Sequence, residues 1–252
     1  MALAISTNNA ALNAAASASS VNRDMETSMA RLSSGKRINS ASDDAAGVAI
    51  SSRLSAEIRG TDQAIRNSLD GQALIDTVEG AHKEIENILQ RMREVAVQSV
   101  NDTNNSQDRT NLQAEMDAMI TEIDRIAGTT TWAGVNLMDA SAGTTFSFQV
   151  GTATGTQNQI SVTISSMNAA GLDVEKAAID IETNLTSRLA AIKEVDDAIK
   201  DVNVQRSKLG AVSNRLSHTV NNLTNISSNL SVAKGGIEDA DFALETTRLA
   251  KN

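Results

Sequence analysis

Few side chains in this sequence could carry out chemistry. Asp43 and Asp44 are adjacent, and the only two imidazoles belong to His82 and His218. Two carboxylates could act as an acid and a base or bind a metal ion, but neighbouring helical residues point about 100° apart. The pair therefore predicts the start of a helix, where Ser42 caps the chain and acidic residues suit the helix dipole.

The sequence also lacks the residues and motifs that other kinds of catalytic or cofactor-binding site need. The chain has no Cys, which excludes thiolate catalysis and Cys-ligated metal sites. His82 lies on an apolar stripe, and His218 lies beside another one. No H-E-x-x-H, G-x-S-x-G or phosphate-loop motif occurs. We therefore expect no catalytic, cofactor-binding or metal-binding residues, and no enzyme.

Composition favours long helices over a compact globule. The chain has 252 residues, no Pro and 2% aromatic residues, so few residues break helices or fill a wide core. The net charge of −9 disfavours nucleic acid and polybasic membrane anchoring. No apolar run approaches the ~18 residues that a membrane span needs. We expect neither nucleic acid nor membrane as a partner.

Two segments carry long helical patterns. Residues 54–99 contain an apolar stripe from Ile75 to Ser99, and aliphatic residues extend it backwards after a phase slip that predicts a coiled-coil stutter. Residues 177–233 alternate steps of three and four over more than five heptads, which predicts a coiled coil that ends at Gly235-Gly236. Helices of 46 and 57 residues are ~69 Å and ~85 Å long. A compact domain of this chain length has a radius of gyration of only ~18 Å, so neither helix fits inside one.

The ends and the middle of the chain differ from these helices. Residues 1–34 and 237–252 are weakly amphipathic and are expected to order only on assembly. Residues 128–171 are rich in Gly and Thr, and the alternation around Phe146 and Val162 predicts a β-hairpin. The predicted fold is therefore mainly α: an elongated bundle of long coiled-coil-like helices from both chain ends, with a small central β-hairpin region.

Polymer or coiled-coil packing is expected at the aliphatic positions of these patterns. They are Ile5, Leu12, Leu32, Ile85, Leu89, Met92, Ile192, Val195, Ile199, Val202, Leu209, Leu216, Val220, Leu223 and Leu230.

Four stretches of the sequence resemble signatures of bacterial flagellin. They are Leu32 to Gly47, Leu89 to Gln98, Leu209 to Arg215, and Ile237 to Phe242. The resemblance covers nearly the whole chain. It implies a subunit that polymerises into the extracellular flagellar filament used for swimming. Export through the flagellar type III apparatus would need no cleaved signal peptide, and no basic residue precedes Arg23 to form one.

The resemblance also implies a division of the chain and a set of partners. Residues 1–43 would be an N-terminal inner-tube segment, and residues 44–235 a helical rod with the hairpin region at about 128–175. Residues 236–252 would start a C-terminal inner-tube segment that is truncated relative to the family. The implied partners are other flagellin subunits, the export chaperone, the filament cap and the hook-associated junction protein.

A host Toll-like receptor is a further implied partner. The positions that match the family's receptor-contacting residues are Arg91, Val95 and Glu115, and many recognised members have Leu where this chain has Val95. Two alternatives to a filament subunit stay open from the residues: a hook–filament junction protein, and a secreted coiled-coil ligand of a host receptor.

Overall fold

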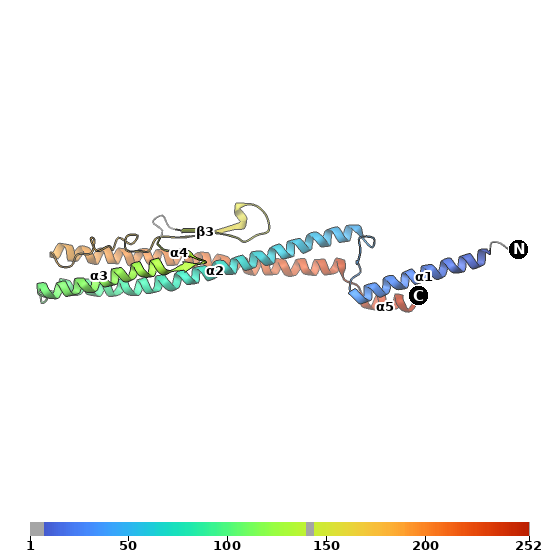
Figure 1. Cartoon of the computed structure of the whole chain (residues 1–252), viewed down its shortest axis with the longest axis horizontal. Coiled ribbons are helices and arrows are strands. Elements are labelled where there is room, and N and C mark those ends of the chain that lie inside the picture. The colour runs from blue at the N-terminus through green and yellow to red at the C-terminus, as the bar shows by residue number, and fades with distance from the viewer. Residues whose placement is uncertain (1–7, 140–143, 252) are drawn as a thin grey trace. The chain divides into compact units, whose positions relative to one another are not determined.

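The computed structural model describes residues 8–139 and 144–251, so the expected packing residue Ile5 lies outside it. The described part of the chain holds five α-helices and two small antiparallel strand pairs (Figure 1). This confirms the predicted fold class, with mainly α structure, long helices and a small central hairpin.

The chain divides into two compact units. Met1–Asp62 and Thr224–Asn252 form the first, called the terminal unit below, and Gln63–Leu223 form the second, the central unit. The helices are α1 (Asn9–Ser34), α2 (Ala45–Val100), α3 (Ser106–Thr129), α4 (Leu185–Glu238) and α5 (Phe242–Lys251). The strands are β1 (Thr131–Trp132), β2 (Val135–Asn136), β3 (Thr144–Gln149) and β4 (Gln159–Ile164), and a 3-10 turn, η1, covers Thr156–Asn158.

The start of α2 is capped by a different residue from the predicted one. Oδ1 of Asp44 accepts a hydrogen bond from the backbone N–H of Gly47 at 2.9 Å, so Asp44 is the N-cap and the prediction for Ser42 is wrong. Asp43 instead accepts the backbone N–H groups of Asn39 and Ser40, which lowers the pKa of its carboxyl group. The two carboxylates thus stabilise the turn and the helix start separately.

The predicted apolar stripe of α2 lies wholly in the core of the central unit. Its buried members are Ile75, Val78, His82, Ile85, Leu89, Met92, Ala96 and Ser99. The apolar members pack with α3, α4 and the hairpin in one hydrophobic cluster, which includes Ile120, Leu137 and Val195. A side-chain stripe of period 3.5 buries one face of a long helix against its neighbours.

The predicted stutter in α2 is wrong. The buried stripe continues towards the N-terminus in the same phase, through Ala64, Ser68 and Gly71, while Leu69 is 48% exposed. A Cβ atom on Gly71 would lie 3.2 Å from side-chain carbons of both Leu216 and Phe148. Small residues therefore keep this part of the seam buried because they let neighbouring side chains approach closely.

Helix α4 differs from its prediction at both ends and along its seam. It begins at Leu185 rather than at residue 177, and it continues through Gly235-Gly236 to Glu238. Val195, Val202, Leu209, Leu216 and Leu223 are buried as the heptads suggest. The other predicted seam positions, Ile192, Ile199 and Arg206, are only partly buried. The residue before each of them is buried instead: Ala191, Ala198 and Gln205.

Gln205 shows why the buried face of α4 is displaced. Its amide donates to the carbonyl of Thr163 at 2.8 Å, and its side-chain oxygen accepts from Ser165 at 3.2 Å. Helix α4 therefore packs against the polypeptide around β4 as well as against α2. A second packing surface widens the buried face beyond a two-helix seam.

The predicted hairpin is confirmed. β3 and β4 pair in antiparallel register, with Phe146 opposite Val162. One face covers the core, and the other carries cross-strand hydroxyl pairs such as Thr145 with Thr163 at 3.1 Å. The smaller β1–β2 pair was not foreseen, because its turn places Ala133 at φ 49° beside Gly134 at φ 81°, and Ala is not a residue that signals such a turn.

Candidate functional site

Within the terminal unit, the two connectors that follow α1 and α4 run side by side. The N–H of Arg37 donates to the carbonyl of Glu238 at 2.6 Å, and the N–H of Ala240 donates to the carbonyl of Gly35 at 3.0 Å. Gly35 adopts φ 69°, a left-handed conformation that ends α1 and that glycine adopts at little cost. This bridge ties segments about 200 residues apart into one unit.

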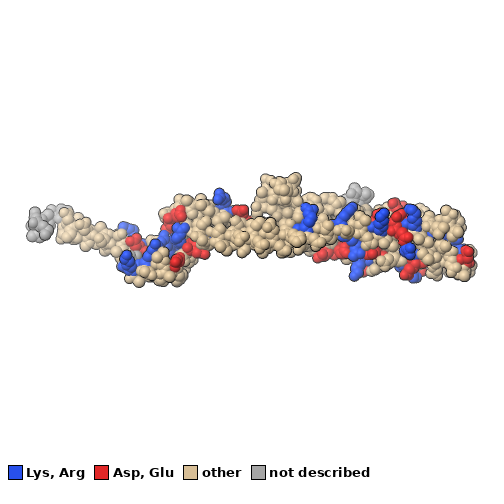
Figure 2. Space-filling model, turned by 180° about the vertical axis from the view of Figure 1, so that it is seen from behind, with Lys and Arg blue, Asp and Glu red and all other residues tan. Residues whose placement is uncertain are grey.

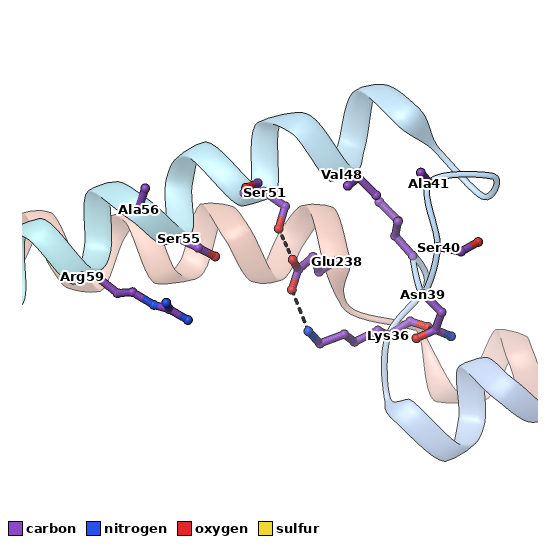
Figure 3. Close-up of a pocket in the computed structure, with 12 residues that line it drawn as sticks. Lys36, Asn39, Ser40, Ala41, Val48, Ser51, Ser55, Ala56, Arg59 and Glu238 are labelled. Atoms are coloured by element: carbon purple, nitrogen blue, oxygen red, sulfur yellow. Dashed lines mark hydrogen bonds and ion pairs between the residues drawn. The ribbon is translucent and has the colours of Figure 1, made fainter.

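Glu238 organises a polar pocket beside this bridge. Its carboxylate accepts a hydrogen bond from Ser51 on α2 and forms an ion pair with Lys36 at 3.2 Å. Figure 3 shows these contacts, with Arg59 and Asn39 on opposite sides of them. The pocket has a volume of about 490 Å³ and is lined largely by hydroxyl and small side chains. Its two kinds of charged side chain are the carboxylate of Glu238 and the cations Lys36 and Arg59, so the pocket is a polar surface.

A second pocket in the terminal unit lies between α1 and α5, where Ser28 and Glu245 are buried. The carboxylate of Glu245 is 3.6 Å from Arg31 and 3.2 Å from Arg248, and its side chain is 6% exposed. Oε1 of Glu245 and Nε of Arg31 are buried without a hydrogen-bond partner. The adjoining cavity of about 360 Å³ is also lined by Asp24, Thr27 and Lys251.

The terminal unit exposes apolar side chains on every helix that it contains. Leu12 on α1 and Phe242 on α5 are each 59% exposed. Further exposed members are Val21, Met25, Met29, Ile50, Ile226, Val232 and Leu244. Every residue from Asn9 to Thr27 is exposed, so within the part of the chain that the structure describes this stretch of α1 has a largely accessible surface.

Charge is distributed unequally between the units. The terminal unit has nine Lys and Arg against ten Asp and Glu, a net charge of −1, and the central unit carries the other −8 of the total −9. Residues 1–22 contain no charged side chain, and this part of α1 is tan in Figure 2. The charge density that opposes close packing of identical chains therefore lies mainly in the central unit.

The three positions expected to contact a receptor do not share one exposed surface. Arg91 donates to Glu115 on α3 at 2.8 Å and to Glu94 at 3.0 Å, and the hydrogen bond to Glu115 is the main cause of a raised pKa for Arg91. Arg91 and Glu115 are accessible, but Val95 is fully buried in the core. The structure thus contradicts the expectation that Val95 lies on an accessible contact surface.

Ion pairs between α2 and α4 were not foreseen from the sequence. Arg93 contacts Asp196 at 2.5 Å, and Arg206 lies between Glu79, at 2.7 Å, and Glu86. Arg206 occupies a position that the heptad pattern placed in the apolar seam. These pairs join side chains of two different helices, which spacing along one helix does not reveal.

No group of three or more metal-binding side chains occurs among residues 8–139 and 144–251. In the same part of the chain, no helix combines the length and apolar character needed to cross a membrane.

Comparison with known families matches both ends of the chain. The bacterial flagellin N-terminal helical region matches residues 5–143, and the bacterial flagellin C-terminal helical region matches residues 192–252. The chain belongs to the bacterial flagellin family. Both matched regions contribute to the bridge and to the α1–α5 pair of the terminal unit.

Curated flagellins are similar along most of their length. Flagellin of Bacillus subtilis is 40% identical over a match that covers 98% of this chain and 91% of the relative. Flagellin of Halalkalibacterium halodurans is 46% identical over a match that covers 87% of this chain and 79% of the relative. Polar flagellin F of Vibrio parahaemolyticus is 33% identical over a match that covers 100% of this chain and 93% of the relative. These proteins are structural, and this flagellin is a subunit that polymerises into the extracellular filament used for motility.

Solved structures agree with this family. The crystal structure of Bacillus cereus flagellin has a TM-score of 0.53 and 30% identity, and covers 67% of this chain and 94% of its own. A flagellar hook-associated protein from Vibrio parahaemolyticus has a TM-score of 0.67 and 15% identity, and the match covers 78% of this chain and 100% of that protein. At that identity the second likeness concerns the fold alone.

Proposed function

We propose that this flagellin makes its principal filament contacts through the terminal unit, using the uncovered part of α1 and the apolar side chains of α5. The observation that carries this proposal is the exposure of every residue from Asn9 to Thr27. A helix rich in Ala and Ser, with few tertiary contacts, is marginally stable in water. Contacts with neighbouring subunits would supply the missing burial.

The charge distribution supports the same surface. Each subunit carries −9, so packing many identical copies brings like charges together. Contacts made through a unit with a net charge of −1 limit this repulsion, whereas contacts made only through the −8 unit would increase it. The uncharged residues 9–22 add contact area without any side-chain charge to desolvate.

The finer assignments carried over from the family remain proposals. They include the division at residues 43 and 235, polymer packing by Leu12 and Leu32, and export without a cleaved signal peptide. Export chaperone, filament cap, hook-associated junction protein and Toll-like receptor are proposed partners. Of the receptor positions, Arg91 and Glu115 are the accessible ones.

Phe242 provides the test of the proposed contact surface. Phe242→Asp is expected to raise the critical concentration for filament assembly by about 100-fold, because a buried aromatic anchor would become a buried charge. Phe242 is 59% exposed in the single chain, so the helical content of the secreted monomer should not change. Sedimentation of filaments over a series of protein concentrations measures the critical concentration, and circular dichroism of the monomer measures the helical content.

Phe242→Leu is the matched control and should assemble within a few-fold of the unmodified protein, since Leu keeps an apolar contact. Normal filaments from Phe242→Asp, at normal concentration, would show that this part of the terminal unit is not a principal contact.

A further inference from the structure

The pocket beside the bridge, drawn in Figure 3, holds more positive charge than its own carboxylate neutralises. Two cations, Lys36 and Arg59, line it with one acid, Glu238, so the lining has a net charge of +1. Glu238 is already engaged, because its carboxylate accepts a hydrogen bond from Ser51. The same carboxylate lies 3.2 Å from Lys36 and 3.8 Å from Lys234. The pocket therefore favours an anion, in a chain whose total charge is −9.

Arg59 is the cation without a partner at this pocket. Its side chain forms no ion pair and no hydrogen bond with any residue in the described part of the chain. Asp62, three residues further along the same face of α2, accepts a hydrogen bond from Ser227 on α4 at 2.8 Å and does not pair with Arg59. An unpaired guanidinium at a hollow surface is a recognition group for oxyanions.

Two hydroxyl groups lie beside Arg59 on the same face of α2. Ser52, Ser55 and Arg59 follow one another at spacings of three and four residues, and all three line the pocket. Neither hydroxyl makes a hydrogen bond within residues 8–139 and 144–251, so both are free to donate. Figure 3 shows Ser55 and Arg59 on one side of the pocket, and Lys36 on the connector at the other side. Donors thus reach the pocket from two directions.

The arrangement of these donors distinguishes between kinds of anion. The guanidinium of Arg59 and the ammonium group of Lys36 supply positive charge, and the serine hydroxyls supply neutral donors. A carboxylate presents two oxygens in one plane. A phosphate group presents three acceptor oxygens in different directions and carries about −1.5 to −2 charges at neutral pH. A phosphate group therefore suits donors from two directions better than a carboxylate does.

We propose that the pocket lined by Lys36, Ser52, Ser55 and Arg59 binds a phosphate group, either free or carried by a small metabolite. Its volume of about 490 Å³ lies in the range of sites for small organic ligands, so it has room for more than the ion itself. The ligand would join α2 to the connector that follows α1, and so stabilise the terminal unit by mass action. This proposal does not depend on the filament contacts proposed for α1 and α5.

Nuclear magnetic resonance of the secreted, nitrogen-15-labelled monomer tests the site. Inorganic phosphate would be titrated at neutral pH against sodium chloride at constant ionic strength, since exposed charges respond to salt. We expect the amides of Lys36 and of residues 52–59 to shift saturably with a dissociation constant of about 1 mM, as suits a few charge-assisted hydrogen bonds at an accessible site. No saturable shift at these amides, up to about twentyfold that concentration, would overturn the proposal.

Two arginine variants separate the pocket from a general effect of charge. Arg59→Gln should weaken phosphate binding at least about fivefold, because it removes the unpaired guanidinium. Arg53→Gln removes the same charge from an exposed position of α2 outside the pocket lining, and should change the dissociation constant less than about twofold. Both side chains are exposed, so the helical content of the monomer should not change. Equal effects of the two variants would overturn the site.

Two further ligands identify the chemistry and its source. Acetate, a single carboxylate, should bind at least about tenfold more weakly than inorganic phosphate, and equal binding would overturn the choice of a phosphate group. Glucose 6-phosphate carries the same group on a sugar. Tighter binding of glucose 6-phosphate than of inorganic phosphate would assign the site to a phosphorylated metabolite. Equal or weaker binding would assign it to the free ion.

Discussion

Replacing Leu216 by Asp is expected to lower the free energy of unfolding of the central unit by about 4 kcal/mol or more. Leu216 is fully buried on α4, and its side chain lies beside Gly71 and the hairpin. The substitution removes an apolar side chain from the core and puts a carboxylate there without a partner, and both changes are destabilising. Urea unfolding followed by circular dichroism measures the loss.

Leu69 offers a matched control on the facing helix. Leu69→Asp makes the same chemical change at a side chain that is 48% exposed, so we expect a loss of less than about 1 kcal/mol. Similar losses for both variants would mean that the phase of the α2 seam described above is incorrect. An unchanged urea midpoint for Leu216→Asp would contradict the core itself.

Acidification is expected to destabilise the chain between pH 6.5 and pH 4 through His82. The pKa of His82 is lowered from its usual 6.5 to about 4, mainly because the imidazole is buried; the charge of Glu79 opposes this change and the charge of Arg206 adds to it. The unfolded chain thus binds a proton in this range that the folded chain does not, so stability falls as pH falls. A shift of this size corresponds to about 3 kcal/mol lost below pH 4.

Substitution of His82 isolates this contribution. His82→Leu places an apolar side chain at this core position and removes the titration, so its unfolding free energy should vary much less between pH 7 and pH 4.5. Carboxylates such as Asp43 and Asp180, whose pKa values are lowered by hydrogen bonds, lose their stabilising charge at lower pH than this window. If the pH dependence persisted in His82→Leu, another group would be its source.

The helices and the hairpin were predictable because their signals are local. Alternation at Phe146 and Val162 and the three–four spacing from Ile75 to Ser99 depend only on neighbouring residues. The buried positions Ser68 and Gly71 were not predicted, because a hydrophobic pattern identifies buried positions only where the side chains are large and apolar. Small residues are buried when a partner comes close, and one helix alone does not show where that happens.

The candidate site was predicted less completely than the fold. Exposure of the N-terminal helix followed from its poverty in aliphatic residues, but Glu245 and Arg31 gave no sequence signal. Their pairing depends on the bridge between residues about 200 positions apart. Val95 shows the reverse case, because a residue matched by position to a surface role is buried by the packing of three helices.

Hydrogen exchange on monomer and filament is the most direct test of the terminal unit as the assembly surface. We expect amides of residues 9–22 to exchange nearly freely in the monomer and to become at least about 100-fold slower in the filament. Amides of the α2 seam from Ile75 to Ser99 should be protected in both states. Equal exchange of residues 9–22 in monomer and filament would contradict the account.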